Sequence, residues 1–233
     1  MLPLLASADP DQLAARARSA LSCPAAASMV IKGTEHLFGG DDLGLQDRGG
    51  VPTLVCRTGS VVERAATAHQ KALLRIISGV VEDDGTTESV VLAGKLASPR
   101  PCCDPSLQAV AIDPTIIMLI RTHADGSTRQ YRVPTALFRS PTHALNRGYL
   151  RRCTEHVNEC HDAELRQAVS LCTGTPAPYL AGAALADLSP TGVEVRWVDA
   201  DGAHRRPVTF DTPARTPDDL AEALRTHLHA GLC

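Results

Sequence analysis

Four segments of the chain carry apolar residues at the spacing of three and four that is typical of an amphipathic helix. They begin at residues 10, 61, 148 and 217. Three of them also have a capping residue directly before the start, namely Asp9, Ser60 and Thr216. The second segment is expected to cover residues 61–73, and its periodicity places His69 on the apolar stripe and therefore towards the core.

Shorter apolar runs with the length or alternation of β-strands lie between these helical segments along the sequence. In the first part of the chain they cover residues 27–32, 53–58, 76–82, 89–97, 107–113, 115–122 and 128–133. Three more follow the third helix, near residues 183–188, 193–199 and 205–210. We therefore predict an α+β protein with a β-rich first part and a small α-β-β-β-α unit after it.

A domain boundary is indicated where the periodic pattern stops. Residues 141–147 contain Pro, Thr and Asn in place of regular apolar positions, and Gly148 follows directly. At 233 residues the chain is long enough for two modest domains. We expect the first domain to cover residues 1–142 and the second to cover residues 147–233.

Composition and charge exclude several classes of function. Hydrophobic residues make up 44% of the chain, yet no apolar run reaches the length of about 20 residues that a membrane-spanning helix needs. The net charge is −3 and no run of Lys or Arg marks a surface for a phosphate backbone. Aromatic residues are only 3%, too few to stack a row of bases. Neither a membrane nor a nucleic acid is an expected partner.

Eight cysteines are unusual for a chain of this size, and none of them forms a Cys-x-x-Cys pair. This spacing excludes the common zinc-ribbon and thioredoxin-like motifs. The first seven residues have no basic region, and their apolar part is too short for an export signal. We therefore expect a cytoplasmic protein whose cysteines are free thiols.

The densest group of reactive side chains lies in the third helical segment. Cys153, His156 and Cys160 follow one another at spacings of three and four and therefore share one face of a helix. Thiolate and imidazole are suitable ligands for zinc or iron, so the three form a candidate metal strip. The alternative is that the two cysteines only flank a buried stripe and that His161, next to Cys160, is satisfied by a hydrogen bond to the backbone or to an acid.

Two further histidines lie on apolar faces. His161 falls on the stripe of Val157 and Leu165, so we expect it in the core or in a pocket beside the core. His227 lies with Leu224 on the apolar face of the last helix. A buried histidine with one hydrogen-bonded ring nitrogen is also what an axial haem ligand looks like.

The same segment resembles a known motif. Residues 155–163 (Glu-His-Val-Asn-Glu-Cys-His-Asp-Ala) resemble the His-Met-Asn-x-Asp-His-Ala-Asp signature of a small C-terminal domain that is catalogued as of unknown function. Asp187 and Gly192 look like the start of its next strand, and residues 207–210 and 216–228 look like its last strand and closing helix. Val157 and Cys160 depart from the signature, which has Met and Asp there.

The resemblance implies a first domain with a split β-barrel similar to pyridoxamine phosphate oxidase, which binds FMN and forms homodimers through the barrel. Relatives include haem-utilisation proteins and a plastid protein that binds glutamyl-tRNA reductase. In the barrel helix, Arg64 and Thr67 stand where His and Asn are expected.

Three functions remain open at this point. The first is a haem-binding protein that degrades or carries haem, with an iron ligand among His69, His156, His161 and His227 and with Arg57, Arg64 or Arg152 neutralising the propionates. The second is an FMN-dependent oxidoreductase. The third is a regulatory partner of an enzyme of tetrapyrrole metabolism, which has kept the fold without a cofactor. The sequence alone does not decide whether the protein is an enzyme.

Overall fold

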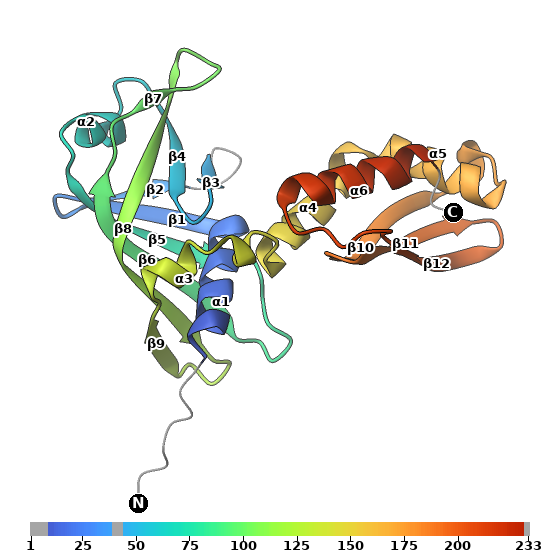
Figure 1. The fold of residues 1–233 in the computed structure, drawn as a ribbon, viewed down its shortest axis with the longest axis horizontal. Coiled ribbons are helices and arrows are strands. Elements are labelled where there is room, and N and C mark those ends of the chain that lie inside the picture. Colours follow the sequence, from blue (N-terminus) through green and yellow to red (C-terminus); the bar gives the residue numbers. More distant parts are fainter. Residues whose placement is uncertain (1–8, 39–43, 231–233) are drawn as a thin grey trace, which may run out of the picture. The chain divides into compact units, whose positions relative to one another are not determined.

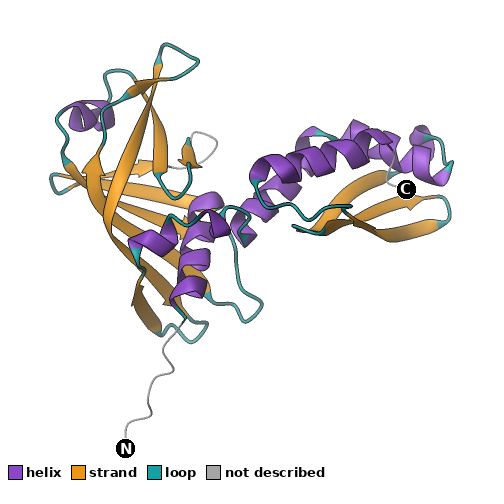
Figure 2. Cartoon of the chain, in the orientation of Figure 1, coloured by secondary structure: helices purple, strands orange, loops and turns teal. Residues whose placement is uncertain are grey.

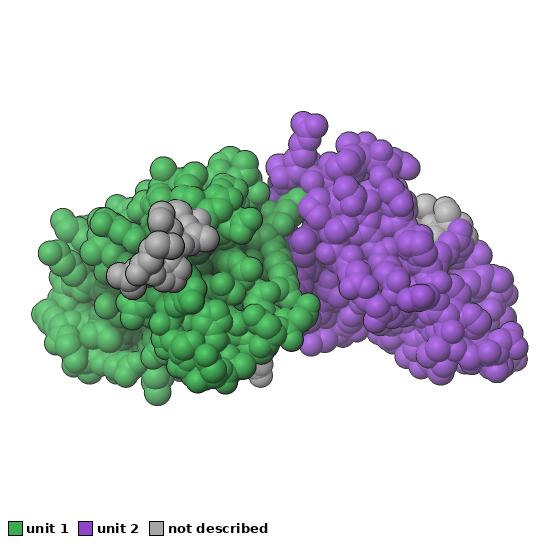
Figure 3. Space-filling model, turned by 90° about the horizontal axis from the view of Figure 1, so that it is seen from below, with its two compact units in different colours: residues 1–148 green, residues 149–233 purple. Residues whose placement is uncertain are grey.

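The computed structural model describes residues 9–38 and 44–230 of the chain, and Figure 1 labels their helices and strands. Strands dominate the first part, and the second part combines helices with a smaller sheet (Figure 2). The chain divides into two compact units, residues 1–148 and residues 149–233 (Figure 3). The sequence placed this boundary between residues 142 and 147.

The first unit is built on one antiparallel sheet of nine strands in the order β2-β1-β5-β6-β8-β4-β3, with β7 and β9 both paired to β8. Its strands are β1 Pro24–Ile31, β2 Thr34–Phe38, β3 Leu45–Asp47, β4 Pro52–Arg57, β5 Lys71–Ser78, β6 Thr87–Leu96, β7 Arg100–Pro101, β8 Leu107–Thr122 and β9 Thr128–Arg132. The start of β8 pairs with β4 and β7, and the rest pairs with β6 and β9. The sheet thus has two parts that share β8, as expected of a split barrel.

Strand β8 is continuous where the sequence predicted two strands. It runs through Pro114, the residue that suggested a break. The register between β6 and β8 shifts at Gly94, which lies opposite Pro114. Proline lacks the N–H that a regular ladder needs, so it is tolerated in a strand where the pairing is irregular.

Three helices accompany the sheet of the first unit: α1 Pro10–Ser22, α2 Val61–Thr67 and α3 Thr135–Phe138. The apolar face of α1, with Ala14, Ala17 and Leu21, belongs to the same buried cluster as the inward residues of the sheet. Burial of such apolar surface is the main stabilising contribution to a domain of this size.

Helix α2 is shorter than the sequence predicted, and the placement of His69 in the core was wrong. The helix ends at Thr67, and β5 begins only four residues later. His69 lies in the turn between them with a φ of 48° and is exposed. The apolar pattern changes from helical to alternating at this point, and the turn that joins the two elements carries His69 away from the core.

A buried arginine fastens α1 to the rest of the first unit. Arg18 is only 2% exposed, and its Nε lies 2.6 Å from Oδ2 of Asp47 in β3. Its Nη1 donates to the carbonyl oxygen of Phe138 at 2.8 Å, and its guanidinium also lies over the Phe138 ring. One side chain therefore connects α1, β3 and α3.

The second unit has a three-stranded antiparallel sheet in the order β10-β11-β12, with helices on one face (Figure 2). Its elements are α4 Arg147–Cys160, α5 Asp162–Thr173, β10 Gly182–Ser189, β11 Gly192–Asp199, β12 Gly202–Thr209 and α6 Pro217–Ala230. Leu185, Val195 and Val208 form part of its buried interior. The predicted α+β fold is confirmed.

The helical segment expected from residue 148, whose periodicity continues to residue 172, is two helices separated by His161. This residue has φ −125° and ψ 28°, outside the helical region, and it stands as the N-cap of α5. Asp162 and Glu164 follow in the first turn of α5, where negative side chains are favourable. Among the described residues, no helix combines the length and the apolar character needed to cross a membrane.

Candidate functional site

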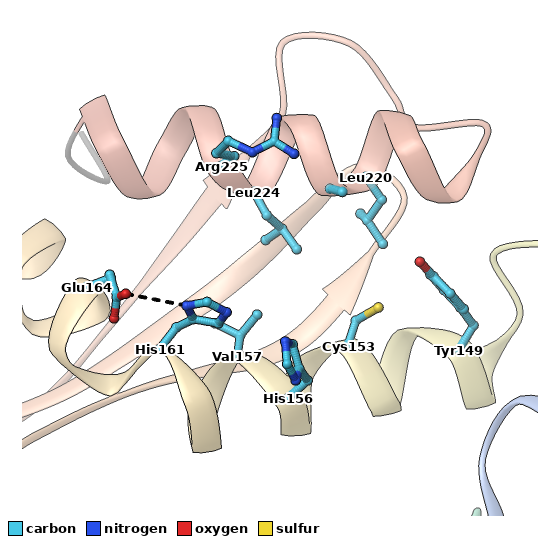
Figure 4. Close-up of a pocket in the computed structure, with 10 residues that line it drawn as sticks. Tyr149, Cys153, His156, Val157, His161, Glu164, Leu220, Leu224 and Arg225 are labelled. Carbon is cyan, nitrogen blue, oxygen red and sulfur yellow. Dashed lines mark ion pairs between the residues drawn. The ribbon is translucent and has the colours of Figure 1, made fainter. Parts of the chain in front are cut away.

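The second unit contains a cavity of about 380 Å³ between α4 and α6, with one end at the start of α5 (Figure 4). Its wall consists of Tyr149, Cys153, His156, Val157, His161, Glu164, Leu220, Ala221, Leu224 and Arg225. Leu220 and Leu224 point from α6 towards α4 (Figure 4). The helical spacing in α4 and α6 brings each set of wall residues to one face, so the cavity follows from two amphipathic helices that face each other.

The two histidines of the wall are in contact. The ring centroids of His156 and His161 lie 5.3 Å apart, with an angle of 78° between the ring planes, which is an edge-to-face arrangement. Nδ1 of His161 lies 3.6 Å from Oε1 of Glu164, three residues further on. The break between α4 and α5 makes this possible, because His161 does not follow the helical path.

The thiol in the wall is held in its neutral form. Burial raises the pKa of Cys153, while a hydrogen bond with Tyr149 and the charge of Arg152 lower it by less. Burial also raises the pKa of Tyr149, and the hydrogen bond with Cys153 adds to this effect. Metal binding needs the thiolate, so this environment favours the imidazoles over the thiol as ligands.

The candidate metal strip is only partly gathered at the cavity. Cys153 and His156 line the wall, whereas Cys160 is exposed and is not part of it. Within residues 9–38 and 44–230, no group of three or more His, Cys, Asp and Glu side chains is placed to hold a metal ion.

The expectation of free thiols holds for most of the described cysteines. Those that are free are Cys23, Cys56, Cys102, Cys103, Cys153 and Cys160. Cys172, near the end of α5, is disulfide-bonded, so the expectation of a free thiol was wrong for this residue. Disulfides depend on the spatial distance between two cysteines, which their spacing along the chain does not reveal.

The remaining candidate residues of the second unit have different surroundings. Arg152 is exposed on α4, next to Cys153. His227 does not line the cavity of His156 and His161. Its ring stacks on Phe210 with 5.6 Å between centroids, and it borders a separate polar cavity on another side of α6.

The first unit holds the other candidates and a second site of interest. Arg57 and Arg64 are exposed, at the end of β4 and on α2. Arg64 lines a cavity of about 440 Å³ together with Lys32 and His36. Sequence analysis did not find Lys32 and His36. A local signal exists in β2, where Thr34 and His36 are two residues apart and therefore lie on the same face of the strand.

Comparison with known proteins defines no family for this chain. No protein-family model matches it, and no curated protein matches it. Among solved structures, it is similar to a haem-binding protein from Mycobacterium smegmatis, with 13% identity over 97% of this chain and 99% of that chain and a TM-score of 0.42. It is also similar to a protein of unknown function from Agrobacterium tumefaciens, with 11% identity over 96% and 98% of the two chains and a TM-score of 0.44.

A further similarity covers about half of the chain. A NimC/NimA family protein from Clostridium acetobutylicum shares 12% identity over 53% of this chain and 94% of that chain, with a TM-score of 0.36. Similarities at this level do not identify the function of this chain.

Proposed function

We propose that this protein binds haem in the cavity between α4 and α6, with His161 as the iron ligand. The observation that carries the proposal is that two imidazoles, those of His156 and His161, open onto a cavity whose other walls are largely apolar. Its volume of about 380 Å³ lies within the usual range of small-molecule sites. When bound, haem supplies an iron centre for electron transfer or oxygen chemistry.

His161 is the better of the two candidate ligands because of its neighbour. A histidine that binds a metal usually directs its other ring nitrogen towards a carboxylate, which fixes the ring and strengthens the bond. Nδ1 of His161 faces Glu164, which leaves Nε2 for the iron. His156 lies beside it and is the second candidate.

Cations near the cavity suit the propionate groups of haem. Arg152 lies on α4 one residue before Cys153 and is exposed. Arg225 belongs to the wall and is paired with Glu222 on the same helix. Guanidinium groups bind carboxylates by charge-assisted hydrogen bonds. Arg57, Arg64 and His69 belong to the first unit, whereas every wall residue belongs to the second.

Titration with haemin tests this function. We expect the wild-type protein to bind one haemin per chain with a shifted Soret band, and His161→Ala to lose that band because its ligand is absent. Glu164→Gln should retain binding with an affinity about 10- to 100-fold lower, the usual cost of losing a carboxylate partner. His227→Ala is the matched control, since His227 lies outside this cavity. An unchanged haemin spectrum at equimolar wild-type protein contradicts the proposal.

A second candidate function, binding of FMN, is favoured by the cavity of the first unit. Lys32, His36 and Arg64 line it, and these side chains suit a phosphate group. Arg64 also donates from Nη1 to the carbonyl oxygen of Gly59, which holds its side chain at the start of α2. The same titration with FMN in place of haemin separates the candidates, because bound flavin loses its fluorescence and its binding would depend on Arg64 rather than on His161.

We also propose that the first unit forms a homodimer through the outer face of its sheet. Leu73, Ile77 and Ile116 form an outer patch, with 39%, 41% and 47% of their surfaces exposed. Ala93 lies between Leu73 and Ile116 in the register, so the patch crosses from β5 over β6 to β8. Large apolar side chains that gather on one exposed face of a sheet are typical of a protein interaction site.

Charged substitutions in the outer patch should separate the dimer. We expect wild-type protein to have twice the 24.7 kDa of one chain in light scattering, and the double variant Leu73→Arg/Ile116→Arg to have the mass of one chain. The physical reason is that each partner would bury two unpaired charges. Leu171→Arg is the control, because Leu171 is 61% exposed on α5 of the second unit. A monomeric wild-type protein would exclude this interface.

A further inference from the structure

Asn158 connects the helix of the cavity histidines to the small sheet by two hydrogen bonds. Its Nδ2 donates to the carbonyl oxygen of Leu185 at 3.0 Å, and its Oδ1 accepts from the backbone N–H of Leu185 at 2.7 Å. Leu185 lies in β10, which pairs only with β11 within the described residues. The side-chain amide therefore takes the place of a neighbouring strand at this point of the sheet edge.

The chemistry of this contact selects an amide side chain. A carboxamide offers a donor and an acceptor side by side, which matches the N–H and C=O of one backbone residue. An ionised carboxylate has no donor and would face the Leu185 carbonyl oxygen with negative charge. The side chain of Leu185 is itself only 3% exposed, so the strand cannot easily shift to meet a different partner.

Asn158 stands between the two histidines along the chain. It follows His156 by two residues and precedes His161 by three, and α4 ends just before His161. Its contact with β10 is therefore made within the last turn of α4, close to the break that turns the His161 ring towards His156.

We propose that Asn158 is a positioning residue, which sets the edge-to-face contact of His156 and His161 by holding the end of α4 against β10. The effect of Asn158 on the contact between the two rings does not depend on haem binding, because it follows from the hydrogen bonds and the ring geometry. Its consequence for haem rests on the proposed function, because His161 can offer Nε2 to the cavity only while the end of α4 keeps its place.

A neighbouring residue provides a matched control. Arg166, on α5, donates from Nη1 to the carbonyl oxygen of Leu180 at 3.2 Å and also pairs with Asp162. It thus ties a helix to the segment before β10 by a side-chain-to-carbonyl bond of the same kind. Arg166 lies on α5, beyond the break at His161, so the loss of its side chain should leave the end of α4 in place.

The first experiment needs no haemin. Nuclear Overhauser contacts between the ring protons of His156 and His161 are recorded in labelled protein of full length. We expect the contacts in wild-type protein and in Arg166→Ala, and their loss in Asn158→Asp and Asn158→Ala. Asn158→Gln keeps the amide and should restore part of the signal. If Asn158→Asp proves unfolded by circular dichroism, the comparison of Asn158→Ala with Arg166→Ala decides, and a ring contact that is as strong in the alanine variant as in wild type contradicts the inference.

A second measurement adds haemin to the same proteins. Asn158→Asp should bind haemin at least tenfold more weakly than Arg166→Ala. Ring contacts that persist in Asn158→Asp, or that vanish equally in Arg166→Ala, overturn the positioning role. If wild-type protein does not bind haemin at all, the proposed function fails, whereas the ring contacts still decide the role of Asn158.

Discussion

Replacing Arg18 with alanine is expected to lower the free energy of unfolding of the first unit by about 3 to 5 kcal/mol, the usual cost of leaving a buried ion without its partner. Asp47 is the ion left behind, and within the part of the chain that the structure describes it would keep the N–H of Gly50 and the hydroxyl of Ser22 as donors. The carbonyl oxygen of Phe138 would also lose its donor at 2.8 Å. Domains are stable by only about 5 to 15 kcal/mol in total, so this loss is large.

Denaturant unfolding of the wild type and of three variants measures the effect. Arg48→Ala is the control, because the side chain of Arg48 is exposed and, among the interactions described, donates only to the side chain of Gln46. Asp47→Asn tests the charge itself, and the double variant Arg18→Ala/Asp47→Asn should lose less than the two single losses added together. A loss in Arg18→Ala no larger than in Arg48→Ala would show that the ion pair does not hold α1.

Replacing Gly148 with alanine is expected to destabilise the protein by about 3 kcal/mol, the upper end of the usual cost of overpacking. A Cβ at this position would lie 2.1 Å from the carbonyl oxygen of Ser19 in α1, and this neighbour is backbone that cannot turn aside. The N–H of Gly148 donates to the Ser19 hydroxyl at 3.2 Å, so the two segments must approach closely. The effect opposes helix propensity, which favours alanine over glycine by about 0.5 to 1 kcal/mol.

Gly182→Ala is the matched control for this prediction. Gly182 lies at the start of β10, and an added Cβ there would meet nothing within 4 Å. Thermal unfolding should show a clear fall in the melting temperature for Gly148→Ala and almost none for Gly182→Ala. Equal melting temperatures for both variants would show that α1 and the start of α4 can separate without cost.

Much of the local structure could be predicted because the signals were themselves local. Ser60 accepts a hydrogen bond from the N–H of Glu63, as expected of the capping residue before α2. The side chain of Asp9 accepts from the N–H of Asp11 and caps α1. Such contacts lie within one turn of the chain, so the order of residues is sufficient to specify them.

The candidate site was predictable only in part. The spacing of Cys153 and His156 placed both on one face of a helix, and both line the cavity. The periodicity continued through His161 and gave no indication of the break there. Lys32, His36 and Arg64 come from a hairpin and a helix that are distant in sequence, so no local pattern joined them.

The sequence by itself determined the classes of element, the α+β fold and the helical face that carries Cys153 and His156, since these depend on periodicity and capping. Only the tertiary structure decided which faces meet. The contact of Asn158 with Leu185, the burial of Arg18 against Asp47 and the cavity between α4 and α6 each join segments far apart in the chain. Their partners are selected by packing and by the need to pair buried polar groups, which are properties of the whole fold.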